Sequence, residues 1–310
     1  MLHRMLCVAL LALVSTVARA EEPALAFNGI AENGFSFDTG MLAGRLQADG
    51  YGLVSLVHKP TGMEVAYGGK HQGPLAIYRT YAGVRRFTDP WSRKAEASLL
   101  GDGTVRLFWP TDEEHPFELD AVYRISSADT VDLTITVKPN QPLPAFEIFV
   151  GSYFASEFPV SVYLAQPRSK TPEASGSMIP VDVSPLTDGT YYMFPRDRQA
   201  AHFLLDGRWE VGKNPVHWSL TRYLAAPLAI RRHAESGVTG VLMARPEDCF
   251  AIAASYNKTP PDGIANHNSI YLSLFGRDVA AGEPATTRCR LVVGTLNDAE
   301  VVERYRAFVK

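Results

Sequence analysis

The segment VDLTITVK (131–138) decides the fold class. Leu133, Ile135 and Val137 alternate in it with Thr134 and Thr136, the period-two pattern of a strand with one buried face. Similar short runs rich in Val, Ile, Leu, Tyr and Phe follow one another along the chain, separated by Gly, Pro, Asn and Asp. Strand and helix patterns do not alternate. The sequence therefore predicts an all-β fold, a large antiparallel sandwich.

One helix is predicted, at the C-terminal end. Asn297 is a suitable N-cap, and Glu300 follows three residues later as in a capping box. Apolar side chains recur at spacings of three and four, which places Val301, Val302, Tyr305 and Phe308 on one face. We expect a helix from about residue 297 that packs this face on the sandwich.

The first twenty residues, MLHRMLCVALLALVSTVARA, differ from the rest of the chain. Arg4 precedes an apolar run, and the segment ends in Ala18-Arg19-Ala20. This is the pattern of a secretory signal peptide with an A-x-A cleavage site, and the run is too short to span a membrane. The prediction is a signal peptide at 1–20, a single domain at 21–310, and a secreted or periplasmic protein without a membrane span.

Composition excludes several classes of protein. The chain has 310 residues, of which 46% are hydrophobic and 20% charged. It is therefore long and apolar enough to bury a large core and is not a disordered chain. Its formal net charge of −3 argues against a nucleic-acid partner. Cys249 and Cys289 remain after the signal peptide, and two readings stay open: a disulfide formed in an oxidising compartment, or two buried thiols.

Two segments are read as loops. Gln166–Asp188 is rich in Pro, Ser and Thr, and Asn257–Asn268 is polar with two consecutive prolines. Loops of this length in a compact domain often carry function. His115, in the turn DEEHP (112–116), is expected to be a surface loop residue.

Three stretches together resemble a known superfamily. They are FSFDTG (35–40) with the hairpin that runs to Glu64, GVLMARPEDCFAI (240–252), and IYLSLFGRDVAAGE (270–283) with the strand that follows it. The pattern is similar to the galactose mutarotase-like β-supersandwich, which aldose epimerases share with domains of many polysaccharide lyases and glycosidases. This resemblance implies a β-supersandwich over 21–310 and a carbohydrate-active protein.

The segment 194–222 is the richest in groups suited to a sugar site. Sugars need aromatic rings for their apolar faces, charged or amide groups for hydroxyls or carboxylates, and an acid–base residue within reach. We expect His217 and Glu210 to be catalytic, and Arg79, Arg196, Trp209, Trp218, Arg222 and His267 to bind substrate. The alternative is structural, with the tryptophans in the core and the charges solvated.

We expect the groove on the concave face of the larger sheet. Strand alternation predicts that Tyr78 and Arg79 face opposite sides. The sequence holds no HExxH, CxxC, calcium-loop or phosphate-loop pattern, so no metal or cofactor is predicted.

The predicted function is acid–base chemistry on a sugar or polysaccharide, of epimerase or lyase type. In β-elimination from a uronate, His217 would take the proton and Arg196 or Arg222 would hold the enolate charge. The alternative is a non-catalytic carbohydrate-binding or structural exported domain, and whether the protein is an enzyme stays open.

Overall fold

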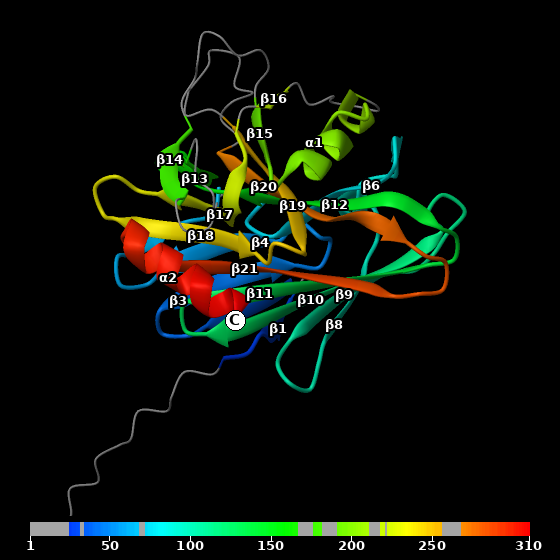
Figure 1. The fold of residues 1–310 in the computed structure, drawn as a ribbon. Helices are drawn as coiled ribbons and strands as arrows, with labels where there is room; N and C mark the ends of the chain where they lie inside the picture. Colours follow the sequence, from blue (N-terminus) through cyan, green and yellow to red (C-terminus); the bar gives the residue numbers. More distant parts are fainter. Residues whose placement is uncertain are drawn as a thin grey trace, which may run out of the picture.

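Three sheets make up the protein in the computed structural model, which describes residues 25–31, 34–67, 72–166, 176–181, 191–210, 218–220, 222–255 and 268–310 (Figure 1). The small N-terminal sheet has the order β1 (Asn28–Ile30), β2 (Gly34–Asp38), β3 (Leu42–Gln47), β4 (Leu53–His58) and β5 (Met63–Glu64). Its inward residues, among them Phe35 and Leu46, join the central core.

Two larger sheets form the sandwich. The upper sheet in Figure 1 has seven strands in the order β16 (Trp218–Leu220), β15 (Tyr191–Pro195), β19 (Cys249–Ser255), β20 (Ser269–Val279), β12 (Leu143–Tyr153), β6 (Ala76–Ala82) and β7 (Arg85–Arg86). The lower sheet has nine strands in the order β14 (Gly176–Pro180), β13 (Val160–Ala165), β17 (Leu224–Arg232), β18 (Val238–Ala244), β21 (Ala285–Thr295), β11 (Thr130–Pro139), β10 (Phe117–Ser127), β9 (Val105–Trp109) and β8 (Glu96–Leu99).

The predicted all-β supersandwich with a C-terminal helix is confirmed. The segment 131–138 lies in β11, where Leu133, Ile135 and Val137 are fully buried, while Thr134 and Thr136 are partly exposed. The strand pairings among the described residues are antiparallel except that of β15 with the short β16, which is parallel.

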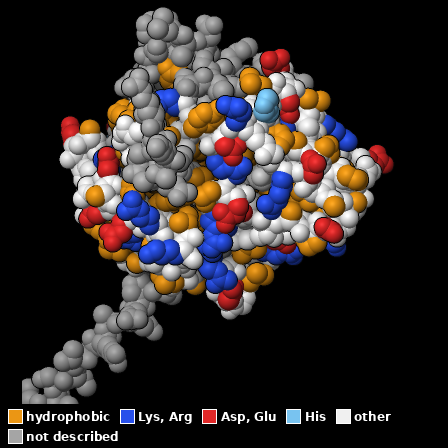
Figure 2. Space-filling view, viewed as in Figure 1, with side chains coloured by type: hydrophobic (Ala, Val, Ile, Leu, Met, Phe, Trp, Pro, Cys, Tyr) orange, Lys and Arg blue, Asp and Glu red, His pale blue; other side chains and the backbone are white. Residues whose placement is uncertain are grey.

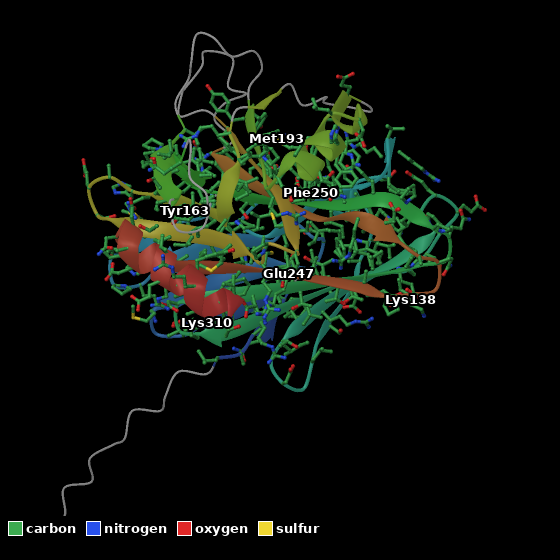
Figure 3. All side chains as sticks on the ribbon, in the orientation of Figure 1. Lys138, Tyr163, Met193, Glu247, Phe250 and Lys310 are labelled. Atoms are coloured by element: carbon green, nitrogen blue, oxygen red, sulfur yellow. The ribbon has the colours of Figure 1, made fainter. Side chains whose placement is uncertain are left out.

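Three apolar clusters occupy different layers. The central core lies between the sheets, and side chains fill this space (Figure 3). A second cluster covers the outer face of the upper sheet, and a third lies between the outer face of the lower sheet and α2 (Asp298–Val309). Alternation along each strand separates the layers: in β12, Ile148 and Val150 point into the core, whereas Phe149 points outward.

The C-terminal helix follows its sequence signals. Asn297 accepts from the Glu300 amide, and the Glu300 side chain accepts in return from the Asn297 amide, so the capping box is complete. Val301, Tyr305 and Phe308 are buried against the lower sheet. Lys and Arg side chains are interspersed with Asp and Glu over the face that carries α2 (Figure 2), and ion pairs such as Arg232–Asp298 at 2.7 Å link them.

Four features differ from the sequence expectations or resolve them. His115 is 2% exposed rather than on the surface, because its ring packs edge-on against Phe117 and its Nδ1 lies 2.7 Å from Asp112. A second helix, α1 (Arg198–Leu204), and strand β14 lie in segments for which the sequence predicted neither a helix nor a strand. Cys249 and Cys289 are free, buried thiols. No helix among the described residues is long and apolar enough to cross a membrane.

Candidate functional site

The outer face of the upper sheet carries a dense set of aromatic rings. We call this set, with the arginine among it, the tyrosine–arginine cluster: Tyr78, Arg79, Tyr81, Phe149, Tyr153, Tyr191 and Tyr271. It is built by outward positions of four strands of the upper sheet, β6, β12, β20 and β15. Trp91, on the short helix η1 (Pro90–Ser92), closes one side with its ring 4.1 Å from that of Tyr78.

A β-bulge brings Tyr78 and Arg79 to the same side of the sheet. Arg79 pairs with Phe149 and Ile77 with Val150, so Tyr78 is the extra residue. The Arg79 guanidinium donates to the Tyr78 hydroxyl at 2.6 Å and lies 4.4 Å from the centre of its ring. The prediction that these two side chains face opposite sides is therefore wrong, because the bulge breaks the alternation on which it depended.

Arg79 is a buried charge held by phenols. The residue is 1% exposed, and its guanidinium also donates to the Tyr81 hydroxyl at 3.5 Å. Because a guanidinium carries five N–H donors in a planar fork, it is suited to recognise a carboxylate or a pair of hydroxyl oxygens.

The remaining tyrosines form a hydrogen-bonded layer. Tyr271 stacks on Phe149 with ring centres 4.5 Å apart and planes 2° apart, and its hydroxyl donates to that of Tyr153 at 3.2 Å. Burial raises the pKa of Tyr153, Tyr191 and Tyr271. These phenols are therefore neutral near pH 7, where they donate hydrogen bonds and do not act as bases.

Glycine at position 151 leaves room for this layer. Gly151 lies in β12 between Phe149 and Tyr153, and a Cβ atom there would stand 3.0 Å from the Tyr153 ring and 3.3 Å from the Tyr271 ring. The absence of a side chain lets the Tyr271 ring lean over the backbone of β12.

The other end of the same face is covered by α1 and by the short helix η3 (Arg208–Glu210) (Figure 1). Asp197 caps α1 by accepting from the Ala200 amide at 2.8 Å. Met193 and Phe250 lie beneath this cover (Figure 3). Arg79 lies in β6, and the segment 194–222 begins in β15; both strands belong to the smaller, upper sheet, whereas the groove was predicted on the larger one.

A buried ion pair fastens η3 to the sheet. Arg208 and Glu147 have fully buried side chains, and their Nη1 and Oε2 atoms are 2.9 Å apart. Asp206, which is partly exposed, adds a second ion pair to Arg208 at 2.7 Å. Trp209 follows and packs its ring 4.4 Å from Phe149 and 5.1 Å from Tyr81.

The structure brings some of the predicted site residues together and separates others. Arg79 and Trp209 both adjoin Tyr81 on the outer face, although Trp209 is 1% exposed and serves as packing. Glu210 is exposed at the end of η3. Arg196 pairs with Asp197 at 2.8 Å, and Arg222 donates to the Ala165 carbonyl at 2.7 Å.

His217 and His267 lie outside the described residues, and Trp218 is described for its backbone alone. The described residues next to them in sequence can be placed. Trp218 pairs with Tyr191 in the parallel β15–β16 ladder, and Ser269 pairs with Tyr153.

Sequence reasoning missed Tyr153, Tyr191 and Tyr271. A usable signal exists in β20, in the stretch IYLSL (270–274): Ile270, Leu272 and Leu274 occupy inward positions, and Tyr271 lies between them on the outward side. A tyrosine in the outward register of a strand that is buried on both faces indicates a covered outer surface.

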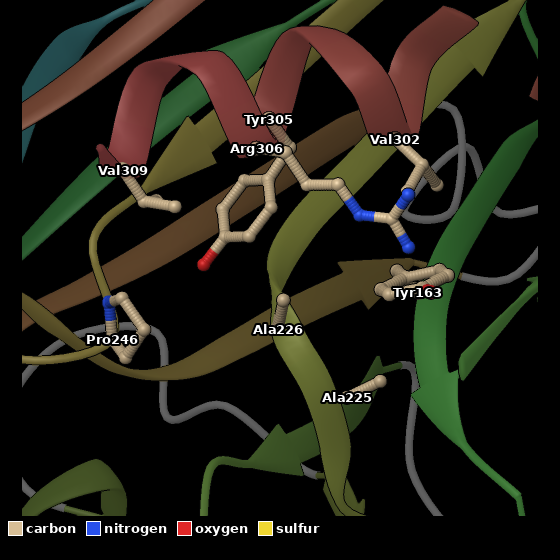
Figure 4. A pocket seen from close by; sticks show the side chains of 8 residues that line it. All are labelled: Tyr163, Ala225, Ala226, Pro246, Val302, Tyr305, Arg306 and Val309. Atoms are coloured by element: carbon tan, nitrogen blue, oxygen red, sulfur yellow. The ribbon is translucent and has the colours of Figure 1, made fainter. Parts of the chain in front are cut away.

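A hollow lies on the other side of the sandwich, between α2 and the lower sheet. This cavity of about 190 Å³ has Ala225 and Ala226 at its floor and Tyr163, Tyr305 and Arg306 around it. Figure 4 shows the Arg306 side chain extending from α2 toward the Tyr163 ring. Its lining is mainly apolar, and it lies apart from the tyrosine–arginine cluster.

Comparison with known proteins identifies the fold. No family model matches the chain, and no curated protein matches it in sequence. A galactose mutarotase-like protein from Lactobacillus casei superposes with a TM-score of 0.52 at 11% identity, covering 84% of this chain and 99% of the other. An aldose epimerase homologue from C. elegans gives a TM-score of 0.50 at 9% identity, covering 83% and 96%. The chain has the galactose mutarotase-like fold, which confirms the resemblance at the level of the fold.

Proposed function

We propose that the protein is an exported carbohydrate-active protein that binds a sugar on the outer face of the upper sheet and transforms it by acid–base chemistry, of epimerase or lyase type. The observation that carries the proposal is the buried Arg79 guanidinium set among the rings and hydroxyls of Tyr78 and Tyr81. The fold supports it, since the two similar structures are titled as mutarotase-like or aldose epimerase proteins. Fold alone does not decide activity, so the argument rests on the site.

The chemistry of the cluster suits either reaction. In epimerisation and in β-elimination alike, a base removes a proton while negative charge grows on an oxygen of the sugar. Neutral tyrosine hydroxyls and a guanidinium donate to such an oxygen, and they do so in a site from which water is largely excluded. Tyr271 and Arg79 would supply this stabilisation, and the aromatic rings would pack on the apolar face of the sugar.

The base must come from elsewhere, because the buried phenols are protonated. We propose His217 for this role, with Glu210 as the second choice and His267, Trp218, Arg196 and Arg222 as further substrate contacts. Support comes from described neighbours: Trp218 pairs with Tyr191 and Ser269 with Tyr153, so the chain near both histidines joins strands of this face. A neutral histidine near pH 7 can accept a proton from a sugar.

The test is an activity screen with purified protein. Polarimetry would follow interconversion of aldose anomers, and near-ultraviolet absorbance would follow the unsaturated product of β-elimination from uronate polysaccharides. With a substrate in hand, His217→Ala should lower the rate by about a hundredfold or more, as expected for a lost acid–base group. His202→Ala is the matched control, since His202 is exposed on α1. Full activity of His217→Ala in a folded protein would remove His217 from the mechanism.

A second candidate function is sugar binding without turnover. Glu147, the carboxylate on this face, is already bound to Arg208, and burial keeps the phenols protonated. A folded protein that binds sugars in calorimetry but converts none of the substrates in the screen would favour this candidate.

Export belongs to the same proposal. The signal-peptide pattern at 1–20 lies outside the described residues, and we propose cleavage before Glu21. Mass spectrometry of secreted or periplasmic protein should find Glu21 at the N-terminus. An intact Met1 on exported material would contradict cleavage.

A further inference from the structure

A further buried arginine, Arg231, lies beneath the tyrosine–arginine cluster. Arg231 lies near the end of β17, two residues after the inward-facing Ala229, so it points into the sandwich. It is 1% exposed. Its guanidinium crosses to the upper sheet, where it donates to the Ser255 hydroxyl at 3.1 Å and to the Ser269 carbonyl at 3.0 Å.

These two serines belong to the strand ends that carry the tyrosines. Ser255 pairs with Tyr191 between β19 and β15, and Ser269 pairs with Tyr153 between β20 and β12. Tyr271 follows Ser269 by two residues on the same strand. Arg231 therefore binds the ends of β19 and β20 from the core side of the upper sheet. The hydroxyl layer lies on the opposite side of these strand ends.

The partners of Arg231 are dipoles, not charges. A third bond goes to the Phe158 carbonyl at 2.7 Å, and none of the ion pairs found among the described residues includes Arg231. Burial lowers the pKa of Arg231 to about 9, which still leaves it protonated near pH 7. A buried cation without a carboxylate is costly, and such groups concentrate at functional sites.

The charge of Arg231 acts on the same layer of phenols as that of Arg79, and the two share Tyr191. Arg231 interacts electrostatically with Tyr191 and Tyr271, and Arg79 does so with Tyr153 and Tyr191. Two guanidinium groups thus bracket the hydroxyl layer, one in the outer face and one beneath it. Their combined field favours negative charge at the layer.

We propose that the ligand of this site is a sugar acid whose carboxylate lies at the hydroxyl layer, and that Arg231 is a positioning residue that selects it through its buried charge. The inference rests on the proposed function, because it assumes that a sugar binds on the outer face of the upper sheet. A charge about 10 Å away in a protein of effective dielectric constant about 20 changes affinity for an anion by roughly tenfold.

The experiment is calorimetric titration with two matched pairs, D-galacturonate against D-galactose and D-glucuronate against D-glucose. Wild-type protein should bind the acid of at least one pair about tenfold or more tightly than its aldose. Arg231→Gln keeps hydrogen-bond donors but removes the charge, so it should weaken binding of the acid about tenfold and leave the aldose within twofold. Arg231→Lys should retain the preference.

Arg232→Gln is the control, since Arg232 follows on the same strand and binds Asp298 on the surface. It should leave both affinities unchanged.

Aldoses bound as tightly as their acids by wild-type protein would overturn the inference and leave the proposed function standing. Equal losses for acid and aldose in Arg231→Gln would also overturn it, since they would show a structural role. Failure of all four sugars to bind would overturn the proposed function, and this inference with it. The wild-type comparison needs no variant, so the inference stays falsifiable if Arg231→Gln does not fold.

Discussion

Removing Arg208 is the sharpest test of how the cover of the site is held in place. Arg208→Met leaves the fully buried carboxylate of Glu147 without its 2.9 Å partner. Breaking one side of a buried ion pair costs about 3–5 kcal/mol, a large share of a typical stability of 5–15 kcal/mol. For a chain of this size the loss corresponds to a fall of roughly 6–10 °C in Tm. Asp206 also loses a partner, but water reaches it, so it adds little.

The sign of the pH dependence follows from the same burial. Burial raises the pKa of Glu147 above its ordinary value of 4.5, and Arg208 opposes that rise. Without Arg208 the pKa of Glu147 in the folded state rises further. As pH rises, Glu147 therefore loses its proton in the unfolded chain before it does so in the folded protein. Stability then falls as pH rises through the window between the unfolded and folded pKa values. The penalty of Arg208→Met should therefore be greater at pH 8 than at pH 5.

Urea unfolding followed by tryptophan fluorescence measures this penalty, since Trp209 is adjacent. The double variant Glu147→Met with Arg208→Met should recover most of the loss, because replacing both partners by apolar groups is near neutral. Lys138→Met is the control: its pair with Glu118 is exposed at 3.9 Å, so the loss should stay below about 1 kcal/mol. A loss below about 1 kcal/mol in Arg208→Met, or a double variant equal to the sum of the singles, would refute the reasoning.

Three further predictions concern other parts of the molecule. Phe308→Ala should cost about 3 kcal/mol in urea unfolding, because the ring is 4% exposed under α2, whereas Phe308→Leu should cost less than about 1.5 kcal/mol. Burial alone would raise the pKa of Asp132, but hydrogen bonds from Arg290 at 2.6 and 2.7 Å hold it below 3.8. The stability that the ionised Asp132 contributes is present above pH 3.8 and is lost as pH falls through the lowered pKa. Acid titration of Asp132→Asn should therefore lack that loss. Gly151→Ala should weaken sugar binding severalfold and lower the Tm, because the added methyl group would stand 3.0 Å from the buried Tyr153 ring and 3.3 Å from the buried Tyr271 ring; unchanged affinity would separate these rings from the site.

Local patterns predicted the fold well because strand alternation and helix capping are determined within a few residues. The segment 131–138 showed its buried face through Leu133, Ile135 and Val137, and Asn297 with Glu300 marked the start of α2. His115 was misread because its burial depends partly on Phe87, which is distant in the chain and packs on the His115 ring together with Phe117.

The candidate site was harder to predict because it is assembled from distant strands. Arg79 was identified from its aromatic neighbours, but a bulge visible only in the β6–β12 register decides which way it faces. Trp209 and Arg208 occur in a charge-rich segment that resembles a binding loop, yet Glu147, which lies 61 residues earlier, turns that segment into a packed cover. Pairing between such positions leaves no local periodicity to detect.

Crystals of the protein grown with saturating D-galacturonate, and separately with D-galactose, test the location of the site most directly. The account predicts sugar density on the outer face of the upper sheet, in contact with Tyr78, Arg79 and Tyr271. Sugar bound instead in the cavity under α2 would contradict the account. So would crystals grown with saturating sugar that show no sugar density on this face.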